Sequence, residues 1–125
     1  MADIPEVIEA AKRASLVNLD GTLQFYLPDA GICECYWVDV NPGEPPKNLD
    51  WQGKVEWSAA TCRRRFDEVI NTIDLVRAGR DEFGGPLREL ADGGTDISQF
   101  MCFVWNVCDQ EEYEELERLA GQWPK

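Results

Sequence analysis

The sequence predicts an α+β fold with an antiparallel sheet of about four strands, a three-strand meander plus a buried central strand, and helices packed on one face. Three features of the 125-residue chain predict it. Residues 16–40 hold short alternating apolar segments separated by turn residues, residues 58–78 carry an apolar stripe at helical spacing, and residues 100–105 are an unbroken apolar run. No linker or repeat divides the sequence, so we expect a single domain over residues 1–125.

A first helix is predicted over residues 4–14. Asp3 is a favourable N-cap, Pro5 suits the first turn, and Glu6 follows the cap by three residues as in a capping box. Apolar residues recur at helical spacing within this range, so we expect the helix to pack one side against the sheet.

Two short strands are predicted next, at residues 16–19 and 23–27, joined at Asp20-Gly21. We favour a three-residue loop over a two-residue turn, because only the longer loop pairs apolar residues of the two strands on one face.

A second turn is predicted at residues 28–31, with Gly31 in the left-handed position that follows a type I turn. The strand at residues 32–40 carries apolar side chains on both faces, which predicts a covered, interior strand. Together with the two preceding strands it would form the meander.

A long loop is predicted at residues 41–56, which contain three prolines and two glycines without periodicity. Compact domains seldom keep a connection of this length unless it has a function, so this loop is a candidate site. Ser58 is predicted to cap a long helix that runs to Ala78 and ends at Gly79.

The last third of the chain is predicted to contain a short helix, a strand and a terminal helix. The short helix is expected at residues 86–91, and residues 97–108 read as a fully buried strand at the centre of the sheet. Asp109 is predicted to begin the terminal helix, with Glu112 three residues on in a capping box.

Net charge is the strongest feature of the composition. The chain has 24 Asp and Glu against 12 Lys and Arg, a net charge of −12. Such a field repels nucleic acid and anionic membranes and attracts basic proteins, so we expect a basic protein partner and no direct contact with nucleic acid or membrane.

A cytoplasmic location is expected from two observations. No segment approaches the roughly 18 apolar residues of a membrane span, and the first residues lack the basic and apolar regions of a secretion signal. The five cysteines, an odd number without regular spacing, fit reduced thiols better than a disulfide framework.

Histidine is absent from the sequence, which removes the commonest general base at neutral pH and the Ser-His-Asp and Cys-His arrangements. Three kinds of catalytic site are still compatible with the sequence: a carboxylate pair, an activated cysteine such as Cys33, or a carboxylate-bound Mg²⁺ or Mn²⁺ site. Carboxylates are so common here that a close pair carries little information. No glycine-rich segment has the form of a phosphate or dinucleotide site, so we predict no cofactor and no enzymatic activity.

The cysteines offer a possible metal site. Cys33 and Cys35 share one face of a predicted strand, roughly 7 Å apart along the chain. A four-ligand zinc site would need two of Cys62, Cys102 and Cys108 to converge on them. We favour thiols packed in the core, and therefore predict no metal site.

Arginine forms the one basic cluster, at residues 63–65. On a helix these three side chains fan through about 200° and cannot make one basic patch. We expect them to pair with Asp67 and Glu68, which follow on the same helix, or with carboxylates of the acidic flanks of the chain; a site for an anionic ligand is the alternative.

Two segments are candidate partner-binding sites. Glutamates of the terminal helix suit its first turn and a solvated face, but they also present spaced negative charge of the kind that a nucleic-acid-binding protein accepts in place of phosphates. Tryptophans at the end of the long loop could anchor a contact or fold back over the sheet edge. The candidate residues are Glu44, Asp50, Trp51, Glu56, Trp57, Asp109, Glu111, Glu114 and Glu115.

The function hypothesis that follows is a non-enzymatic inhibitor that blocks a basic, nucleic-acid-binding surface of a partner protein. Immunity proteins that neutralise nuclease-like toxins and phage-encoded anti-CRISPR proteins share this description. One alternative is a general adaptor domain that uses the loop at residues 41–57. The other is a small enzyme dependent on carboxylates or a cysteine.

Overall fold

Helices and strands of the protein are described by a computed structural model over residues 3–27, 31–82 and 85–122. The elements are α1 (Ile4–Arg13), β1 (Val17–Leu27), β2 (Gly31–Val40), α2 (Trp51–Thr72), α3 (Leu75–Glu82), α4 (Pro86–Asp92), the 3-10 turn η1 (Ile97–Phe100), β3 (Met101–Cys108) and α5 (Gln110–Ala120). The sheet is antiparallel with strand order β2-β1-β3. The predicted α+β class, with helices packed on one face of an antiparallel sheet, is confirmed.

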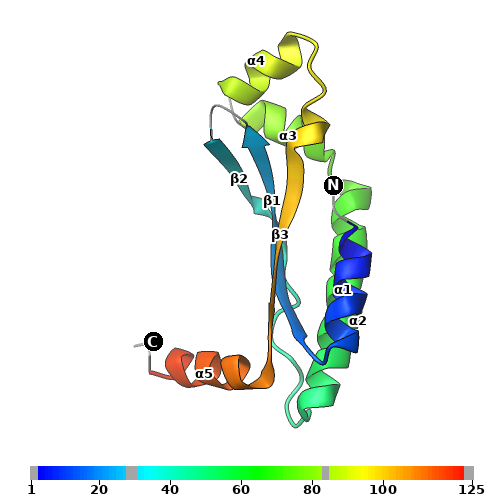
Figure 1. The fold of residues 1–125 in the computed structure, drawn as a ribbon, viewed down its shortest axis with the longest axis vertical. Coiled ribbons are helices and arrows are strands. Elements are labelled where there is room, and N and C mark those ends of the chain that lie inside the picture. Colours follow the sequence, from blue (N-terminus) through cyan, green and yellow to red (C-terminus); the bar gives the residue numbers. More distant parts are fainter. Residues whose placement is uncertain (1–2, 28–30, 83–84, 123–125) are drawn as a thin grey trace.

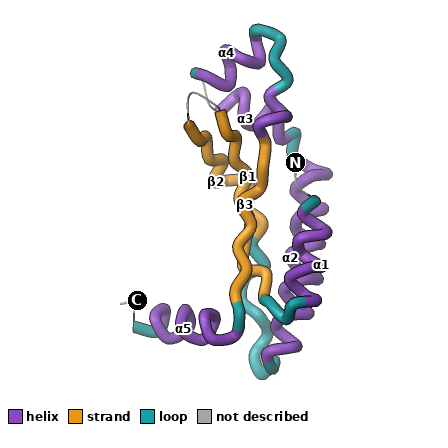
Figure 2. Tube along the Cα trace, viewed as in Figure 1, coloured by secondary structure: helices purple, strands orange, loops and turns teal. Residues whose placement is uncertain are grey.

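The molecule is elongated, with the strands running along its length (Figure 1). Helices α1 and α2 lie side by side and cover one face of the sheet, while α3 and α4 lie at one end (Figure 2). Helix α5 leaves the other end of the sheet and points away from the body. No described helix covers the opposite face of the sheet.

The main core lies between the sheet and the helices. Leu23, Phe25 and Cys35 point from the strands into it and are fully buried, and Ile8 and Cys62 meet them from α1 and α2. In the described residues no helix is both long and apolar enough to cross a membrane.

The N-caps of α1 and α5 follow local sequence and were predicted correctly. The Asp3 carboxylate accepts a hydrogen bond from the Glu6 amide at 3.3 Å and begins α1. The Asp109 carboxylate accepts one from the Glu112 amide at 2.8 Å and begins α5. The short helix predicted at residues 86–91 is α4.

The hairpin predicted at Asp20-Gly21 is wrong, because both predicted segments belong to the single strand β1. Strand β3 pairs with both halves of β1, and the Asp20 carboxylate accepts a hydrogen bond from the Asn106 amide at 2.7 Å. A glycine is needed at position 21 because Trp105 packs closely against it, and not because the chain turns there. A Cβ at this position would lie 2.1 Å from Cε3 of Trp105. The register shifts between Thr22 and Leu23 in the pairing with β2, and between Asn18 and Asp20 in the pairing with β3.

Strand positions also differ from the prediction. The central strand is β1, whereas β2, predicted as interior, and β3, predicted as central and fully buried, form the two edges. Among the β3 side chains only Phe103 and Cys108 are buried, and Asn106 and Val107 are exposed, because an edge strand is covered less completely than the central strand. The strand begins at Met101, since residues 97–100 form η1. Of the turn predicted at residues 28–31, residues 28–30 lie outside the described residues, and Gly31 has the expected positive φ of 92°.

The predicted helix over residues 58–78 is wrong at both ends. The Asp50 carboxylate caps α2 by accepting from the Gly53 amide at 2.7 Å, so the loop shortens to residues 41–50. Ser58, the predicted cap, lies inside α2. At the other end α2 stops at Thr72, and Gly79 lies within α3 against the ring of Phe25 instead of ending a helix.

Candidate partner-binding surface

Tyr113 attaches α5 to the rest of the molecule. None of the α5 residues is fully buried, and Tyr113 is half-buried. Its ring makes a T-shaped contact with Trp51, with centroids 5.6 Å apart, and the Lys54 ammonium lies 5.1 Å from its centroid. Both partners belong to α2, so one aromatic side chain orients α5 against the helix layer.

Replacing Tyr113 with alanine is expected to loosen α5 without unfolding the sheet. An isolated helix of this length is marginal in water, and the aromatic contact contributes about 0.5–1.5 kcal/mol beyond its buried area. Hydrogen exchange should therefore speed up at the α5 amides and stay unchanged in β1. The control is Leu116→Ala, at a half-exposed position of the same helix. Unchanged exchange in α5 of the Tyr113 variant would show that another contact holds the helix.

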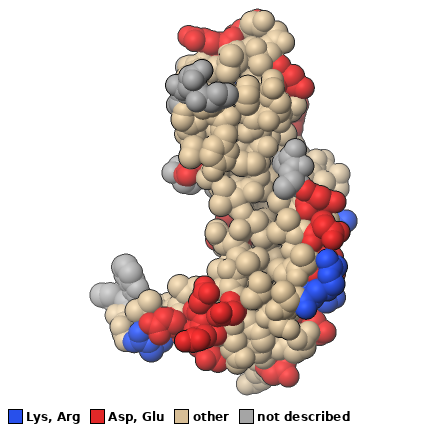
Figure 3. Space-filling view, viewed as in Figure 1, with Lys and Arg blue, Asp and Glu red and all other residues tan. Residues whose placement is uncertain are grey.

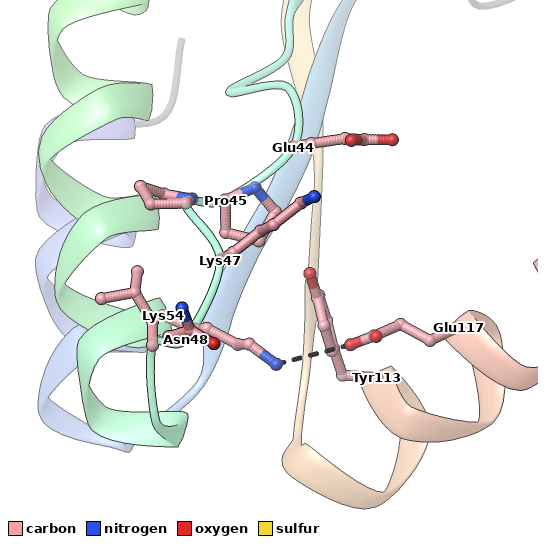
Figure 4. Close-up of a pocket in the computed structure, with 9 residues that line it drawn as sticks. Glu44, Pro45, Lys47, Asn48, Lys54, Tyr113 and Glu117 are labelled. Atoms are coloured by element: carbon pink, nitrogen blue, oxygen red, sulfur yellow. Dashed lines mark hydrogen bonds and ion pairs between the residues drawn. The ribbon is translucent and has the colours of Figure 1, made fainter.

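A cleft of about 540 Å³ lies between the loop at residues 44–49 and α5. Figure 4 shows Tyr113 rising from α5 toward the loop that carries Glu44 and Lys47. Across the cleft, the Lys54 ammonium lies 3.5 Å from Oε1 of Glu117. Burial, and then the charge of Glu117, raises the pKa of the Tyr113 hydroxyl. The loop and the acidic helix, two separate candidates in the sequence, thus meet in one cleft.

Five of the nine candidate residues are exposed and hold no helix end. Glu44 lines the cleft, Glu56 lies on the solvent side of α2, and Glu111, Glu114 and Glu115 project from α5. These five are available to a partner.

Four candidate residues have structural contacts. Asp50 and Asp109 cap α2 and α5. The Trp51 indole donates to the Ser15 carbonyl at 2.9 Å as well as contacting Tyr113. Trp57 is half-buried in α2 and borders a second cavity of about 280 Å³.

Several carboxylates of helices α1 to α4 are paired with arginines of the same helices. Within α2, the Arg63 and Arg64 side chains lie 3.2 and 4.0 Å from the carboxylates of Asp67 and Glu68, which confirms the predicted pairing for two of the three arginines. Further pairs join Arg13 to Glu6, Arg77 to Asp81 and Arg80 to Asp92. Helices α1 and α2 together carry five Asp and Glu against six Lys and Arg, so negative charge on this side of the sheet is balanced.

Carboxylates of α5 and the sheet have far fewer Lys and Arg residues beside them than those of α1 and α2. In α5, Glu115 pairs with Arg118 and Glu117 with Lys54, whereas the other three glutamates have no ion pair with any described residue. The strands carry Asp20, Glu34 and Asp39 and no Lys or Arg. Figure 3 shows red side chains grouped where α5 meets the sheet, and blue and red mixed over α1 and α2.

Two of the sheet carboxylates repel one another. Partial burial, and then the neighbouring charge of Asp20, raises the pKa of the Asp39 carboxyl. The sheet thus presents negative charge without an internal cation to neutralise it.

The cysteines are free thiols, and three of them are buried. Burial raises the pKa of Cys35 to about 11, of Cys62 to about 12 and of Cys108 to about 11. Burial also raises the pKa of Cys33, the reverse of what a nucleophilic cysteine needs. Within the described ranges, no three Cys, Asp or Glu side chains are grouped so as to hold a metal ion.

Buried thiols are expected to resist alkylation. At pH 8 the thiolate fraction of Cys62 is very small, and the surrounding core blocks access to it. Brief treatment of the native protein with iodoacetamide should leave Cys35, Cys62 and Cys108 unlabelled by mass spectrometry, whereas protein unfolded in guanidinium should be labelled at all five cysteines. Rapid labelling of Cys62 in the native state would contradict this.

Tyr113 and Lys54 are the residues of the cleft that sequence reasoning missed. Helical spacing assigns Tyr113 to the apolar side of α5 without showing what it contacts. Lys54 lies in the segment predicted as a loop, so the sequence does not predict that its side chain lies opposite α5.

Comparison with protein-family models, curated proteins and solved structures found no match for this chain.

Proposed function

We propose that this protein is a non-enzymatic inhibitor that docks its acidic side, α5 and the adjoining sheet, against a basic surface of a partner protein. The partner's surface is one that otherwise holds nucleic acid, because spaced carboxylates can stand in for phosphates. A nuclease or a nucleic-acid-binding complex has such a surface, and anti-CRISPR and toxin-immunity proteins act in this way. A cytoplasmic location, with reduced thiols, belongs to the same proposal.

One observation carries the proposal, namely the unequal charge of the two sides of the molecule. Helices α1 and α2 together carry five Asp and Glu against six Lys and Arg, whereas α5 carries five Glu against one Arg, and its Glu111, Glu112 and Glu114 have no ion pair with a described residue. Unbalanced charge on one side steers a basic partner to that side and raises the association rate.

Charge reversal tests the proposal. The variant Glu111→Lys/Glu114→Lys/Glu115→Lys is expected to lower the affinity for poly-L-lysine about tenfold or more at low salt, with a shallower salt dependence. The matched control, Glu6→Lys/Glu9→Lys/Glu68→Lys, changes the net charge by the same amount but places the cations on the helix layer. We expect a much smaller loss for the control.

Isothermal titration at several salt concentrations measures both variants. Equal losses would mean that net charge alone governs binding and that α5 forms no docking surface.

A further inference from the structure

The face of the sheet opposite the helices is apolar as well as acidic. Strand alternation sends Leu23 and Phe25 into the core, so Gln24 and Tyr26 point to the other side. In the register of β1 and β2, Ile32 lies opposite Tyr26. Pairing with β3 adds Cys102 opposite Gln24 and Val104 opposite Thr22. We call the side chains on this side of the three strands the open face; they are Thr22, Gln24, Tyr26, Ile32, Glu34, Trp37, Asp39, Cys102, Val104 and Asn106.

Large apolar side chains are exposed here. Tyr26 is 48% exposed, Ile32 53% and Trp37 49%. Tyr26 and Ile32 are cross-strand neighbours, so they form a continuous apolar surface instead of isolated exposed residues. Aromatic residues in such surfaces commonly supply most of the binding energy of a protein interface.

Carboxylates surround this apolar surface. Glu34 lies beside Gln24, whose amide donates to it at 3.1 Å, and Asp20 and Asp39 follow toward the α5 end. The strands contribute no Lys or Arg. Figure 3 shows the molecule hollowed between α5 and the upper end of the sheet, so the acidic helix borders the same concavity.

Gln24 adds an unused hydrogen-bond acceptor. Its side chain is 8% exposed, and its Oε1 is buried with no partner in the described part of the chain. An unpaired buried acceptor destabilises the folded state, because it has given up its hydrogen bonds to water without gaining another. A Lys or Arg donor arriving at the open face, with a small shift of the covering side chains, would supply the missing hydrogen bond.

A second copy of this chain is a poor occupant for the open face. Each copy has a net charge of −12, and the strands of one copy would bring only carboxylates to the strands of the other. Nucleic acid meets the same repulsion. The chemistry that fits both the apolar surface and its acidic border is a protein segment with apolar residues on one side and Lys or Arg beside them.

We infer that the open face docks a basic amphipathic segment of the partner protein, with its apolar side on Tyr26, Ile32 and Trp37 and its cations beside Glu34, Asp39 and α5. This rests on the proposed function and specifies the partner's chemistry. The acidic side steers the encounter, while the apolar surface holds the complex.

Two probes separate the apolar from the charged contribution. One is an amphipathic helical peptide with leucine on one side and lysine on the other, and the second is poly-L-lysine. The variant Tyr26→Ala/Ile32→Ala removes apolar surface without changing charge. Ile70→Ala is the matched control, at an exposed apolar position on α2. Urea unfolding of each variant verifies that the fold is kept.

We expect the Tyr26→Ala/Ile32→Ala variant to bind the amphipathic peptide about tenfold or more weakly than the native protein, with unchanged affinity for poly-L-lysine. Ile70→Ala should change neither. If the double variant binds the peptide as the native protein does, the open-face inference fails while the proposed function stands. If neither probe binds the native protein in a salt-dependent way, both fail. A concentration-dependent dimer in sedimentation, abolished by the double variant, would assign the open face to a second copy and overturn the inference.

Discussion

Replacing Phe25 with alanine is expected to lower the free energy of unfolding by about 3–5 kcal/mol. Phe25 is fully buried in the central strand, between its pairing partners Cys33 and Met101. Its ring also fills the space above Gly79 of α3, where a Cβ would lie 2.4 Å from Cε2. Truncation therefore leaves a cavity where the sheet meets α3, and the tight packing around it limits collapse.

Tyr26→Ala is the matched control for this prediction. The residue follows Phe25 directly and is also aromatic, but its side chain lies on the open face and is half exposed. We expect a loss of about 0.5 kcal/mol or less. Urea unfolding monitored by circular dichroism measures both variants. Similar losses of unfolding free energy at the two positions would contradict the burial of Phe25 and the exposure of Tyr26 on opposite sides of β1.

Replacing Asn18 with leucine is expected to cost about 2–4 kcal/mol, because it removes the centre of a buried polar network. The Asn18 side chain is fully buried, accepts from the Trp105 indole at 2.9 Å and donates to the Ile8 carbonyl at 3.4 Å. Leucine has a similar shape but leaves the indole N–H and the carbonyl without this partner. The backbone bond from the Asn18 amide to Ser58, 2.9 Å long, would remain.

Asn106→Leu is the control for the network. Asn106 also makes one hydrogen bond between strands, to the Asp20 carboxylate, but it is exposed to water that can replace the bond. We expect its loss to stay within about 0.5 kcal/mol in urea unfolding. A loss at Asn18 no larger than that at Asn106 would mean that water reaches the Asn18 site.

Features that depend on a few neighbouring residues were predictable. Asp3 and Asp109 cap helices by accepting bonds from amides three residues on, and no distant group is needed for that. The arginine pairs of α2 follow from helical spacing in the same way. Asp50, which caps α2 by the same bond to Gly53, was missed because nearby prolines and glycines extended the predicted loop past it.

Features that depend on distant partners were not predictable. Asp20-Gly21 has the local pattern of a hairpin, yet β3 pairs along both sides of it and keeps β1 continuous. Gly21 is needed for the approach of Trp105, which lies far away in the sequence. Asn18 has an ordinary polar side chain in the sequence, and its role as the centre of a buried network appears only when α1, α2 and β3 surround it.

The candidate site divides along the same line. Glutamates of α5 and their exposure follow from composition and helical spacing. The cleft beside Tyr113 and the open face cannot be predicted in this way. When a strand has apolar residues on both sides, its sequence does not show which side the helices cover. That is why β2 was expected to be covered, although Ile32 and Trp37 are half exposed.

By itself the sequence determined the α+β class, the excess of negative charge, and the capped ends of α1 and α5, because each follows from composition or from contacts within one turn of the chain. Only the tertiary structure decided which strand is central, which face of the sheet the helices cover, and which carboxylates have no internal cation. Those outcomes depend on long-range pairing and packing, in which residues far apart in the sequence compete for the same neighbours. The proposed docking surface belongs to this second group, since it is the acidic side that the helices and arginines of this fold do not cover.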